Sequence, residues 1–258
     1  MANRTIYILT AVLLLMAAAG TYYMLDAGSR NLYSGFSSLF ITLQFFVAVL
    51  LFLREYGIKN LAYITGIFVF AMLVETAGVK TGLPFGNYIY SGILRPQIFG
   101  VPIAVGMSWV MTSLATFFII RTLSPVNPVL NILSVSVMMT AYDFILEPFA
   151  AHVNGFWIWQ NGVVPLANYI AWFFISLVIA TVLFKIPAKN RVTLKPDKMT
   201  SLVSAFLILI NIVQFSVVNI SSGHTIPVLT GITVISAVLI FNIFRGSGLE
   251  FDKKYLNA

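Results

Sequence analysis

The sequence predicts an all-α membrane protein, a polytopic bundle of about eight transmembrane helices that forms a single integral membrane domain over residues 1–258. Apolar residues make up 59% of the chain, charged residues make up 9%, and the mean hydropathy is +0.95. Soluble domains are about half apolar and about a quarter charged. The apolar residues also gather in runs of about 20, which is the length of a membrane-spanning helix. A water-soluble globule and a disordered chain are therefore excluded.

Eight such runs follow one another along the sequence. The first, at about 5–25, resembles a signal peptide, but its apolar stretch continues through Tyr22 and Leu25, so we expect an uncleaved helix. The last two runs also hold several polar residues. The other seven runs lie at about 32–53, 61–79, 100–120, 128–150, 165–184, 201–221 and 226–244.

The basic residues predict how the bundle is oriented. With eight crossings both termini lie on one side, and that side carries twelve lysines and arginines against three on the other. Basic loops favour the cytoplasm. We therefore predict a multi-pass protein of the cell membrane, with both termini in the cytoplasm and the basic segment 185–198 against anionic lipid headgroups. The net charge of +7 is thus explained by the membrane, and we expect no nucleic acid partner.

Two loops on the opposite side, residues 80–102 and 152–165, are rich in glycine, proline and aromatic residues. This composition alone is typical of turns and of aromatic belts at a membrane surface. The segments 84–88 and 165–169 also share a short pattern, which is compatible with a parallel duplication. The loop residues that we single out as candidates are Gly82, Pro84, Gly86, Arg95 and His152.

Three acidic residues, Glu75, Asp143 and Glu147, lie inside predicted helices. An ionisable group at a helix centre costs about 2.5–3.5 kcal/mol on insertion, so its default interpretation is functional. Asp143 and Glu147 are four residues apart and therefore share one face of a helix. Pro148 follows directly and removes a backbone donor, which predicts a kink beside the two acids. We take these three acids as the catalytic candidates.

The third and fifth helices both run outward and end at these acids, beneath the two aromatic loops. We therefore expect the three acids to converge with loop residues, among them Arg95 and His152, in one pocket in the outward-facing half of the membrane. The candidates for binding a substrate are Phe85, Asn87, Tyr88, Tyr90, Trp109, Tyr142, Trp157, Trp159, Asn168 and Trp172.

Two carboxyls in a site of low dielectric constant do not both ionise cheaply, so one of them is expected to stay protonated. A carboxylic acid beside a carboxylate forms an acid–base pair, and aromatic ring faces stabilise a developing cation. This combination suits the protonation of a hydrophobic alkene. It suits a proton-coupled carrier equally well. The sequence has no cysteine and only two histidines, and we expect neither a metal nor a cofactor.

Ordered motifs over residues 70–175 resemble the CruF-type family of carotenoid biosynthesis membrane proteins, which includes carotenoid 1,2-hydratases and bisanhydrobacterioruberin hydratases. The resemblance places a catalytic core at about 61–184, with additional helices at about 201–244. The motifs that carry it are ETAG (75–78), TGLPFGNYIY (81–90), GVP (100–102), Trp109, YDFILEP (142–148), GFWIW (155–159) and GVVPLANYIAW (162–172).

The resemblance implies an enzyme that adds water across the terminal double bond of an acyclic carotenoid and forms a tertiary alcohol without a cofactor. Its expected partners are the lipophilic carotenoid, the lipid bilayer and other enzymes of the pathway. Within this reaction we expect Asp143 to be the acid, with Glu147 or Glu75 orienting the water.

Two alternatives stay open at this point. Asp143 and Glu147 are spaced as in part of a magnesium–diphosphate motif, which would indicate a membrane prenyltransferase. Such an enzyme needs more carboxylates for its metal ions and more cations for the diphosphate than this sequence offers. The second alternative is a proton-coupled carrier of a lipophilic solute, in which acids within the membrane are equally typical.

Overall fold

The computed structural model describes residues 2–26, 35–124, 127–186 and 195–256. The described chain contains eight helices that are long and apolar enough to cross a membrane, as the sequence predicts. The predicted kind of fold, an all-α bundle, is therefore confirmed. The helices are α1 (Ala2–Leu25), α3 (Ser37–Tyr56), α4 (Leu61–Thr81), α5 (Ile103–Leu123), α6 (Pro128–Glu147), α7 (Leu166–Lys185), α8 (Lys198–Ser221) and α9 (Thr225–Leu256).

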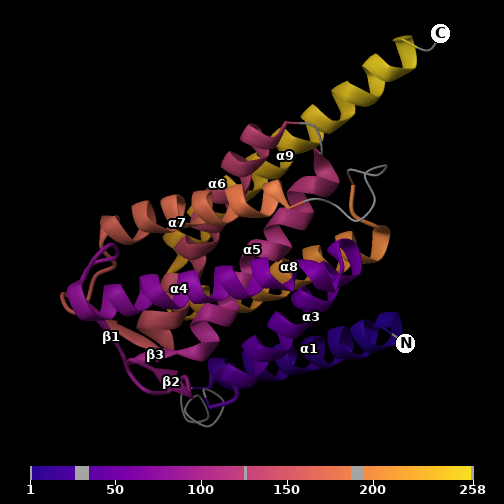
Figure 1. Cartoon of the computed structure of the whole chain (residues 1–258). Helices are drawn as coiled ribbons and strands as arrows, with labels where there is room; N and C mark the ends of the chain where they lie inside the picture. The colour runs from indigo at the N-terminus through magenta and orange to yellow at the C-terminus, as the bar shows by residue number, and fades with distance from the viewer. Residues whose placement is uncertain (1, 27–34, 125–126, 187–194, 257–258) are drawn as a thin grey trace.

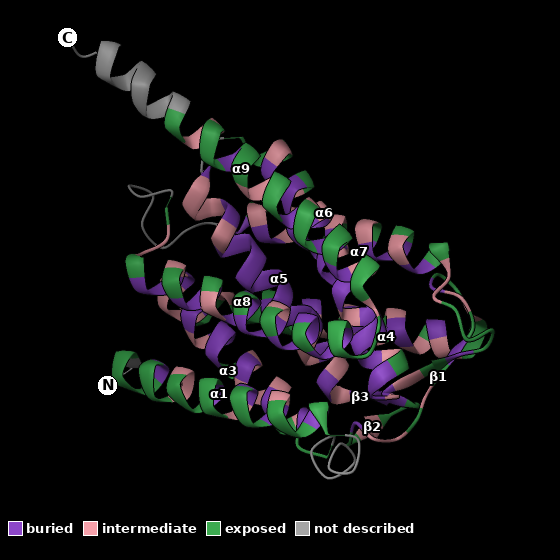
Figure 2. Cartoon of the chain, turned by 180° about the vertical axis from the view of Figure 1, so that it is seen from behind, coloured by how far each residue is buried: buried purple, intermediate pink, exposed green. Residues whose placement is uncertain are grey.

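Helix α5 is the centre of the bundle. It is the most buried of the eight helices, and α3, α4, α6 and α8 all pack against it (Figure 1). Helix α9 lies on the outside against α6 (Figure 2). The start of α1 and the end of α9 lie at the same end of the bundle, and the short strands lie at the other.

Four short strands lie in the two aromatic loops. β1 (Tyr88–Tyr90) pairs antiparallel with β4 (Trp157–Trp159), and β2 (Gln97–Ile98) pairs with β3 (Val101–Pro102). The β1–β4 pair joins the loop after α4 to the loop after α6. Because side chains alternate along a strand, the aromatic residues of both strands face inward, while Ile89 and Ile158 are exposed on the other side.

The chain after α6 continues as one π-helical turn, η2 (Pro148–Val153). Pro148 has no N–H to donate, so the α-helical ladder is interrupted at this point. The Asn219 side chain of α8 donates to the Ile145 carbonyl at 2.7 Å. This backbone oxygen, which lies beside the interruption, thereby has a hydrogen-bond partner. Where the sequence predicts a kink at Pro148, the structure shows a change from α-helix to π-helix.

The end of the bundle away from the strands is held by polar contacts between α3 and α8. Asp197 caps α8 by accepting from the Thr200 backbone N–H at 2.7 Å, and it pairs with Arg54 of α3. Partial burial opposes ionisation, but the Thr200 hydrogen bonds and Arg54 outweigh it and lower the pKa of Asp197. Glu55 accepts from the Thr200 hydroxyl at 2.7 Å. The short 3₁₀ helix η1 (Ile58–Asn60) leads into α4 at the same end.

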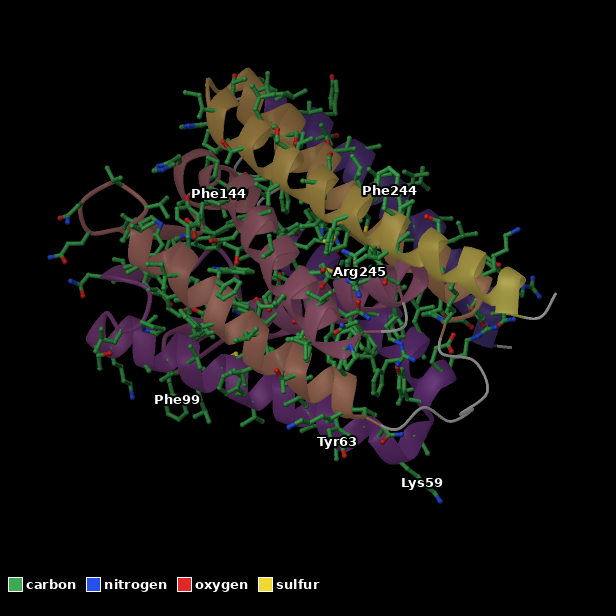
Figure 3. The ribbon with its side chains drawn as sticks, turned by 90° about the horizontal axis from the view of Figure 1, so that it is seen from above. Lys59, Tyr63, Phe99, Phe144, Phe244 and Arg245 are labelled. Atoms are coloured by element: carbon green, nitrogen blue, oxygen red, sulfur yellow. The ribbon has the colours of Figure 1, made fainter. Side chains whose placement is uncertain are left out.

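The orientation predicted from the charges is testable because the chain contains no cysteine. Lys59 lies at one end of the bundle and Phe99 at the other (Figure 3). We expect a single cysteine at Lys59 to react with a membrane-impermeant maleimide only after the cytoplasmic face is opened. A cysteine at the exposed Gln160, beyond β4, should react in intact cells. The reverse pattern would contradict the orientation and with it the outward position of the site.

Candidate active site

A cavity of about 100 Å³ lies among the helices at the strand end of the bundle. It is smaller than the roughly 300–1,000 Å³ pockets that enclose whole ligands, so it fits the end of a long molecule. Its wall is mostly apolar and aromatic, and all four tryptophans of the chain contribute to it. The aromatic residues of the wall are Phe40, Phe85, Tyr88, Tyr90, Trp109, Tyr142, Phe149, Phe156, Trp157, Trp159, Trp172 and Phe215.

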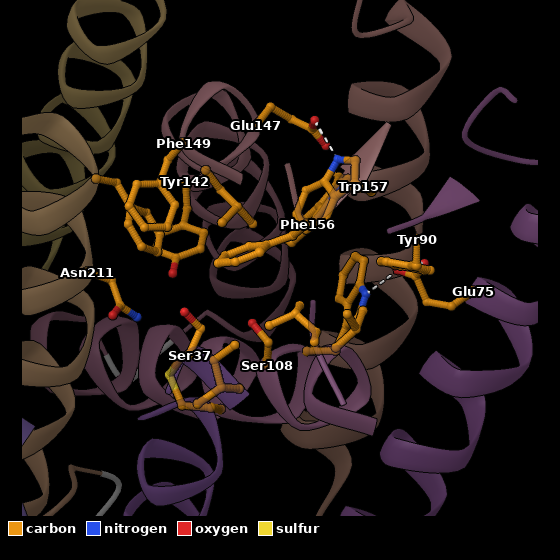
Figure 4. Close-up of a pocket in the computed structure, with 18 of the residues that line it drawn as sticks. Ser37, Glu75, Tyr90, Ser108, Tyr142, Glu147, Phe149, Phe156, Trp157 and Asn211 are labelled. Atoms are coloured by element: carbon orange, nitrogen blue, oxygen red, sulfur yellow. Dashed lines mark hydrogen bonds between the residues drawn. The ribbon is translucent and has the colours of Figure 1, made fainter. Parts of the chain in front are cut away.

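Glu75 of α4 reaches the cavity and is 5% exposed. Its Oε2 accepts from the hydroxyls of Tyr88 and Tyr90 at 2.6 and 2.8 Å, and its Oε1 accepts from Trp109 Nε1 at 2.9 Å (Figure 4). Burial, and then the nearby Glu75, raise the pKa of the Tyr88 and Tyr90 hydroxyls, which therefore keep their protons at neutral pH.

Glu147, at the end of α6, reaches the same cavity and is 2% exposed. Its Oε2 accepts from Trp157 Nε1 at 3.1 Å and from Trp159 Nε1 at 2.9 Å. Its Oε1 accepts from the amide of Asn168, on α7, at 3.2 Å. Glu147 thus has three donors, as Glu75 does, and all three come from neighbouring elements of the fold.

Asp143 lies one turn before Glu147 and is completely buried. Its Oδ2 accepts from Asn168 Nδ2 at 2.7 Å, so one amide bridges the two carboxyls. Its Oδ1 has no hydrogen-bond partner among the described residues. Asp143 does not line the cavity, so the residue expected to be the acid stands behind Glu147 and Asn168.

The two glutamates occupy equivalent positions in a repeated arrangement. Each lies in a helix, is bonded by two aromatic residues of the following strand, and receives a third donor from the next helix. The strand register is symmetric about Ile89 and Ile158, since Tyr88 faces Trp159 and Tyr90 faces Trp157.

The short pattern shared by residues 84–88 and 165–169 does not mark this repeat. Residues 84–87 form the loop that leads into β1, which Tyr88 begins, whereas Pro165 is the N-cap of α7 and residues 166–169 are its first turn. The equivalent segments are β1 and β4, which carry Tyr-Ile-Tyr and Trp-Ile-Trp.

Three expected members of the pocket lie outside it. Arg95 is exposed, and its Nε donates to the Gly92 carbonyl at 2.8 Å. His152 is exposed and stacks on His224, with ring centroids 5.4 Å apart. Asn87 is exposed, although its backbone carbonyl accepts from Gln160 and so helps to join the two loops. The expected convergence therefore holds for the glutamates and the aromatic residues, but not for these three.

The candidate glycines and proline shape the loops. Gly82 ends α4 in a left-handed conformation, and a Cβ there would meet the Asn87 side chain. Gly86, at φ +114°, lies against Pro165, which a Cβ would approach to 2.7 Å. Only a glycine fits this contact between the two loops. Pro84 is exposed and does not line the cavity.

Sequence reasoning missed a second group of polar residues on the cavity wall. Ser37 and Gln44 come from α3, and Asn211 and Gln214 come from α8. These helices lie outside the motif-bearing region at 70–175 and outside the expected catalytic core at 61–184. The available signal was the presence of amides within apolar helices, which membrane helices use to bond to one another.

The family of the chain follows from a comparison of sequences. The sequence profile of the family described as carotenoid biosynthesis protein matches residues 36–238, which is most of the chain. The chain belongs to this carotenoid biosynthesis family. The resemblance noted from the motifs is thereby confirmed.

One protein of similar sequence to this chain is bisanhydrobacterioruberin hydratase of Haloarcula japonica. It is 29% identical over 118 residues, which cover 43% of this chain and 40% of the relative. The match therefore spans less than half of either protein. No solved structure matches the chain.

The position of the tryptophans gives a direct test of binding. An acyclic polyene that enters the cavity comes close to all four indoles, so we expect it to quench the intrinsic fluorescence of the purified protein. Ser108 lies on the cavity wall, and Ser108→Leu should fill part of the space and weaken the quenching at each polyene concentration. Equal quenching of both proteins would mean that the polyene binds elsewhere.

Proposed function

We propose that this chain is a hydratase that adds water to the terminal C=C bond of an acyclic carotenoid and produces a tertiary 1-hydroxy end group. The observation that carries the proposal is a pair of buried glutamates, Glu75 and Glu147, on one small aromatic cavity. Membership of a carotenoid biosynthesis family and a distant relative named as a hydratase support it. The cavity has room for the reacting end of the substrate, while the rest of the apolar chain extends outside it.

The two sets of donors suggest different roles for the two glutamates. A tyrosine hydroxyl both donates and accepts hydrogen bonds, so Tyr88 or Tyr90 can turn to accept a hydrogen bond from the O–H of a protonated Glu75. Indole and amide N–H groups only donate, so Trp157, Trp159 and Asn168 require acceptor oxygens on Glu147. We therefore assign Glu75 as the general acid and Glu147 as the general base.

The reaction follows from these assignments. Glu75 gives its proton to C2 of the terminal isoprene unit, and the π electrons form the new C–H bond and leave a tertiary cation at C1. Water attacks C1 and forms the C–O bond, and Glu147 takes the proton that the water releases. One water is consumed with no net change of oxidation state. The proton that Glu147 has taken from the water is passed back to Glu75 before the next turnover, which restores both carboxyls.

The aromatic wall would lower the energy of the cation. Trp109 and Trp172 stack with ring centroids 4.0 Å apart, and Tyr88 lies 5.1 Å from Trp159. Ring faces attract a cation, by about 2 kcal/mol or more where water is excluded. The same indoles that bind the glutamates would thus present their faces to the reacting carbon.

Asp143 takes a different role from the one expected from the sequence. Because it does not line the cavity, it acts through Asn168, whose amide it orients toward Glu147. Asp143 is therefore a positioning residue, and the proton donor is a glutamate on the cavity wall.

A prenyl diphosphate fits this cavity less well. Among the described residues that line it, none is a lysine or an arginine. A diphosphate carries several negative charges, and proteins bind such groups with Arg, Lys or metal-bound carboxylates. A neutral hydrocarbon end suits the wall better, which favours the hydratase over the prenyltransferase.

Isotope labelling tests the reaction class. A host that makes an acyclic carotenoid and expresses this chain should accumulate a product heavier by one water. In ¹⁸O-labelled water the mass of this product should rise further by about two units, because water supplies the oxygen. Label that arrives from molecular oxygen would indicate a hydroxylase and would refute the proposal. An unchanged carotenoid that crosses proteoliposome membranes would instead favour a carrier.

The assignment of the acids predicts a ranking of variants. Glu75→Gln and Glu147→Gln should each lower kcat by at least about 100-fold, since general acid–base catalysis contributes about 10²–10⁴-fold. Asp143→Asn should cost less, because an amide oxygen still accepts from Asn168. Glu55→Gln, whose carboxylate binds Thr200 at the opposite end of α3, is the control and should keep full activity. Full activity of Glu75→Gln together with an inactive Asp143→Asn would return the acid role to Asp143.

A further inference from the structure

The cavity has a second polar side that the reaction above does not use. We infer that Ser37, Gln44, Tyr142 and Asn211 form a binding site for a neutral hydroxyl group, either a water molecule or an alcohol. We call these four residues the amide–hydroxyl wall. They belong to α3, α6 and α8, and all four line the same cavity as the glutamates.

Two amides fix the geometry of this wall. Gln44 Nε2 donates to Asn211 Oδ1 at 3.0 Å, and Asn211 Nδ2 donates to Gln44 Oε1 at 2.9 Å. The reciprocal pair determines which end of each amide is nitrogen and which is oxygen. Each amide uses one N–H and one lone pair in the pair and retains one of each for a further partner. The Tyr142 hydroxyl is one such partner for Asn211. Both amides are buried and line the cavity, so a ligand in the cavity can bond to the groups that remain, above all those of Gln44.

Ser37 adds a hydroxyl that lacks a partner. Its side chain is 6% exposed, and its Oγ has no hydrogen bond among the described residues. In Figure 4 the hydroxyls of Ser37 and Tyr142 and the amide of Asn211 point toward a common space in the cavity. A buried polar atom without a partner costs free energy comparable to a lost hydrogen bond. A ligand that bonds to Ser37 would remove this cost.

The chemistry of the wall selects the ligand. Its four side chains are neutral, and each both donates and accepts, as an O–H group does. A water in a protein needs about two to four polar partners and a site of at least about 10–15 Å³, and a cavity of about 100 Å³ meets the second condition. A carboxylate or phosphate would find no positive charge among the described residues of the wall. A neutral hydroxyl is therefore the class of ligand that fits.

This inference rests on the proposed function, because only that reaction gives the bound hydroxyl group a role. If water occupies the wall, the wall stores and orients the nucleophile that hydration consumes. If an alcohol occupies it, the substrate already carries a hydroxyl near the end that enters the cavity. The two sources predict different effects of the same substitution.

The test compares Ser37→Ala with Ser204→Ala. Ser204 of α8 is also a buried hydroxyl without a partner among the described residues, but it does not line the cavity. Affinity is measured from tryptophan quenching with two polyenes of equal length, one a hydrocarbon and one with a terminal tertiary hydroxyl. Hydration kcat and the melting temperature of each purified variant are measured alongside.

If the wall binds a substrate alcohol, the wild type should bind the hydroxylated polyene about 2–10-fold more tightly, the worth of one neutral hydrogen bond. Ser37→Ala should abolish this preference, and Ser204→Ala should retain it. If the wall binds water, both polyenes should bind equally. Ser37→Ala should then melt at a lower temperature than Ser204→Ala and, where hydration occurs, lower kcat on both polyenes by about 2–10-fold.

Identical behaviour of the two alanine variants in affinity, melting temperature and kcat would overturn the inference. Affinity and melting temperature do not require turnover, so a chain that fails to hydrate can still support or refute the site. Asn211→Leu, which breaks the amide pair, should change the same readouts in the same direction and by more. The test does not depend on this variant, because Ser37→Ala removes only one oxygen.

Discussion

Carboxyl groups inside a membrane bundle depend on donors from the protein, because lipid supplies none. Glu75 and Glu147 obtain three donors each, and none of these comes from the helix that carries the acid. The helix α4 is thereby tied to β1 and α5, and α6 is tied to β4 and α7. The bonds that satisfy the acids are thus the bonds that hold the loops over the cavity, so the site and this end of the fold depend on the same interactions.

The strand pair β1–β4 turns this requirement into a geometry. Because the side-chain period of a strand is two, both tyrosines of β1 and both tryptophans of β4 point to the same side, toward their acids. A shift of one residue in either strand would turn its two donors away from the acids and bring its central isoleucine, which has no side-chain N–H or O–H, to their side. The close approach of Gly86 to Pro165 holds the two loops together beside the pair. The register is therefore fixed by hydrogen bonding to the two buried glutamates as well as by the strand ladder.

Much of this arrangement follows from sequence. Hydropathy locates the eight helices, and the four-residue spacing of Asp143 and Glu147 places them on one face, where Asn168 now bridges them. Helical periodicity predicts which residues share a face of a helix, but not which side chains of other helices pack on that face. The position of Asp143 behind the cavity was therefore not predictable. Arg95 and His152 were expected in the pocket because they are close in sequence to its residues, yet their backbone directs them outward. Gln44 and Asn211 are 167 positions apart, and no local pattern relates them.

The different roles proposed for the two glutamates rest on whether their neighbours donate hydrogen bonds, accept them, or do both. Tyrosine both donates and accepts, so the donors of Glu75 tolerate either state of that carboxyl, whereas the indoles and the amide at Glu147 need an acceptor in every state. Two similar acids in one cavity are thereby made different by their neighbours rather than by their own chemistry. In the amide–hydroxyl wall, Gln44 keeps an N–H and a lone pair beyond its bonds to Asn211, and Ser37 Oγ has no partner among the described residues, so an O–H group would complete the wall. With the proposed roles of Glu75 as proton source and Glu147 as proton acceptor, and with a place for a hydroxyl, the cavity would hold the groups needed to add water to an alkene in an apolar surrounding.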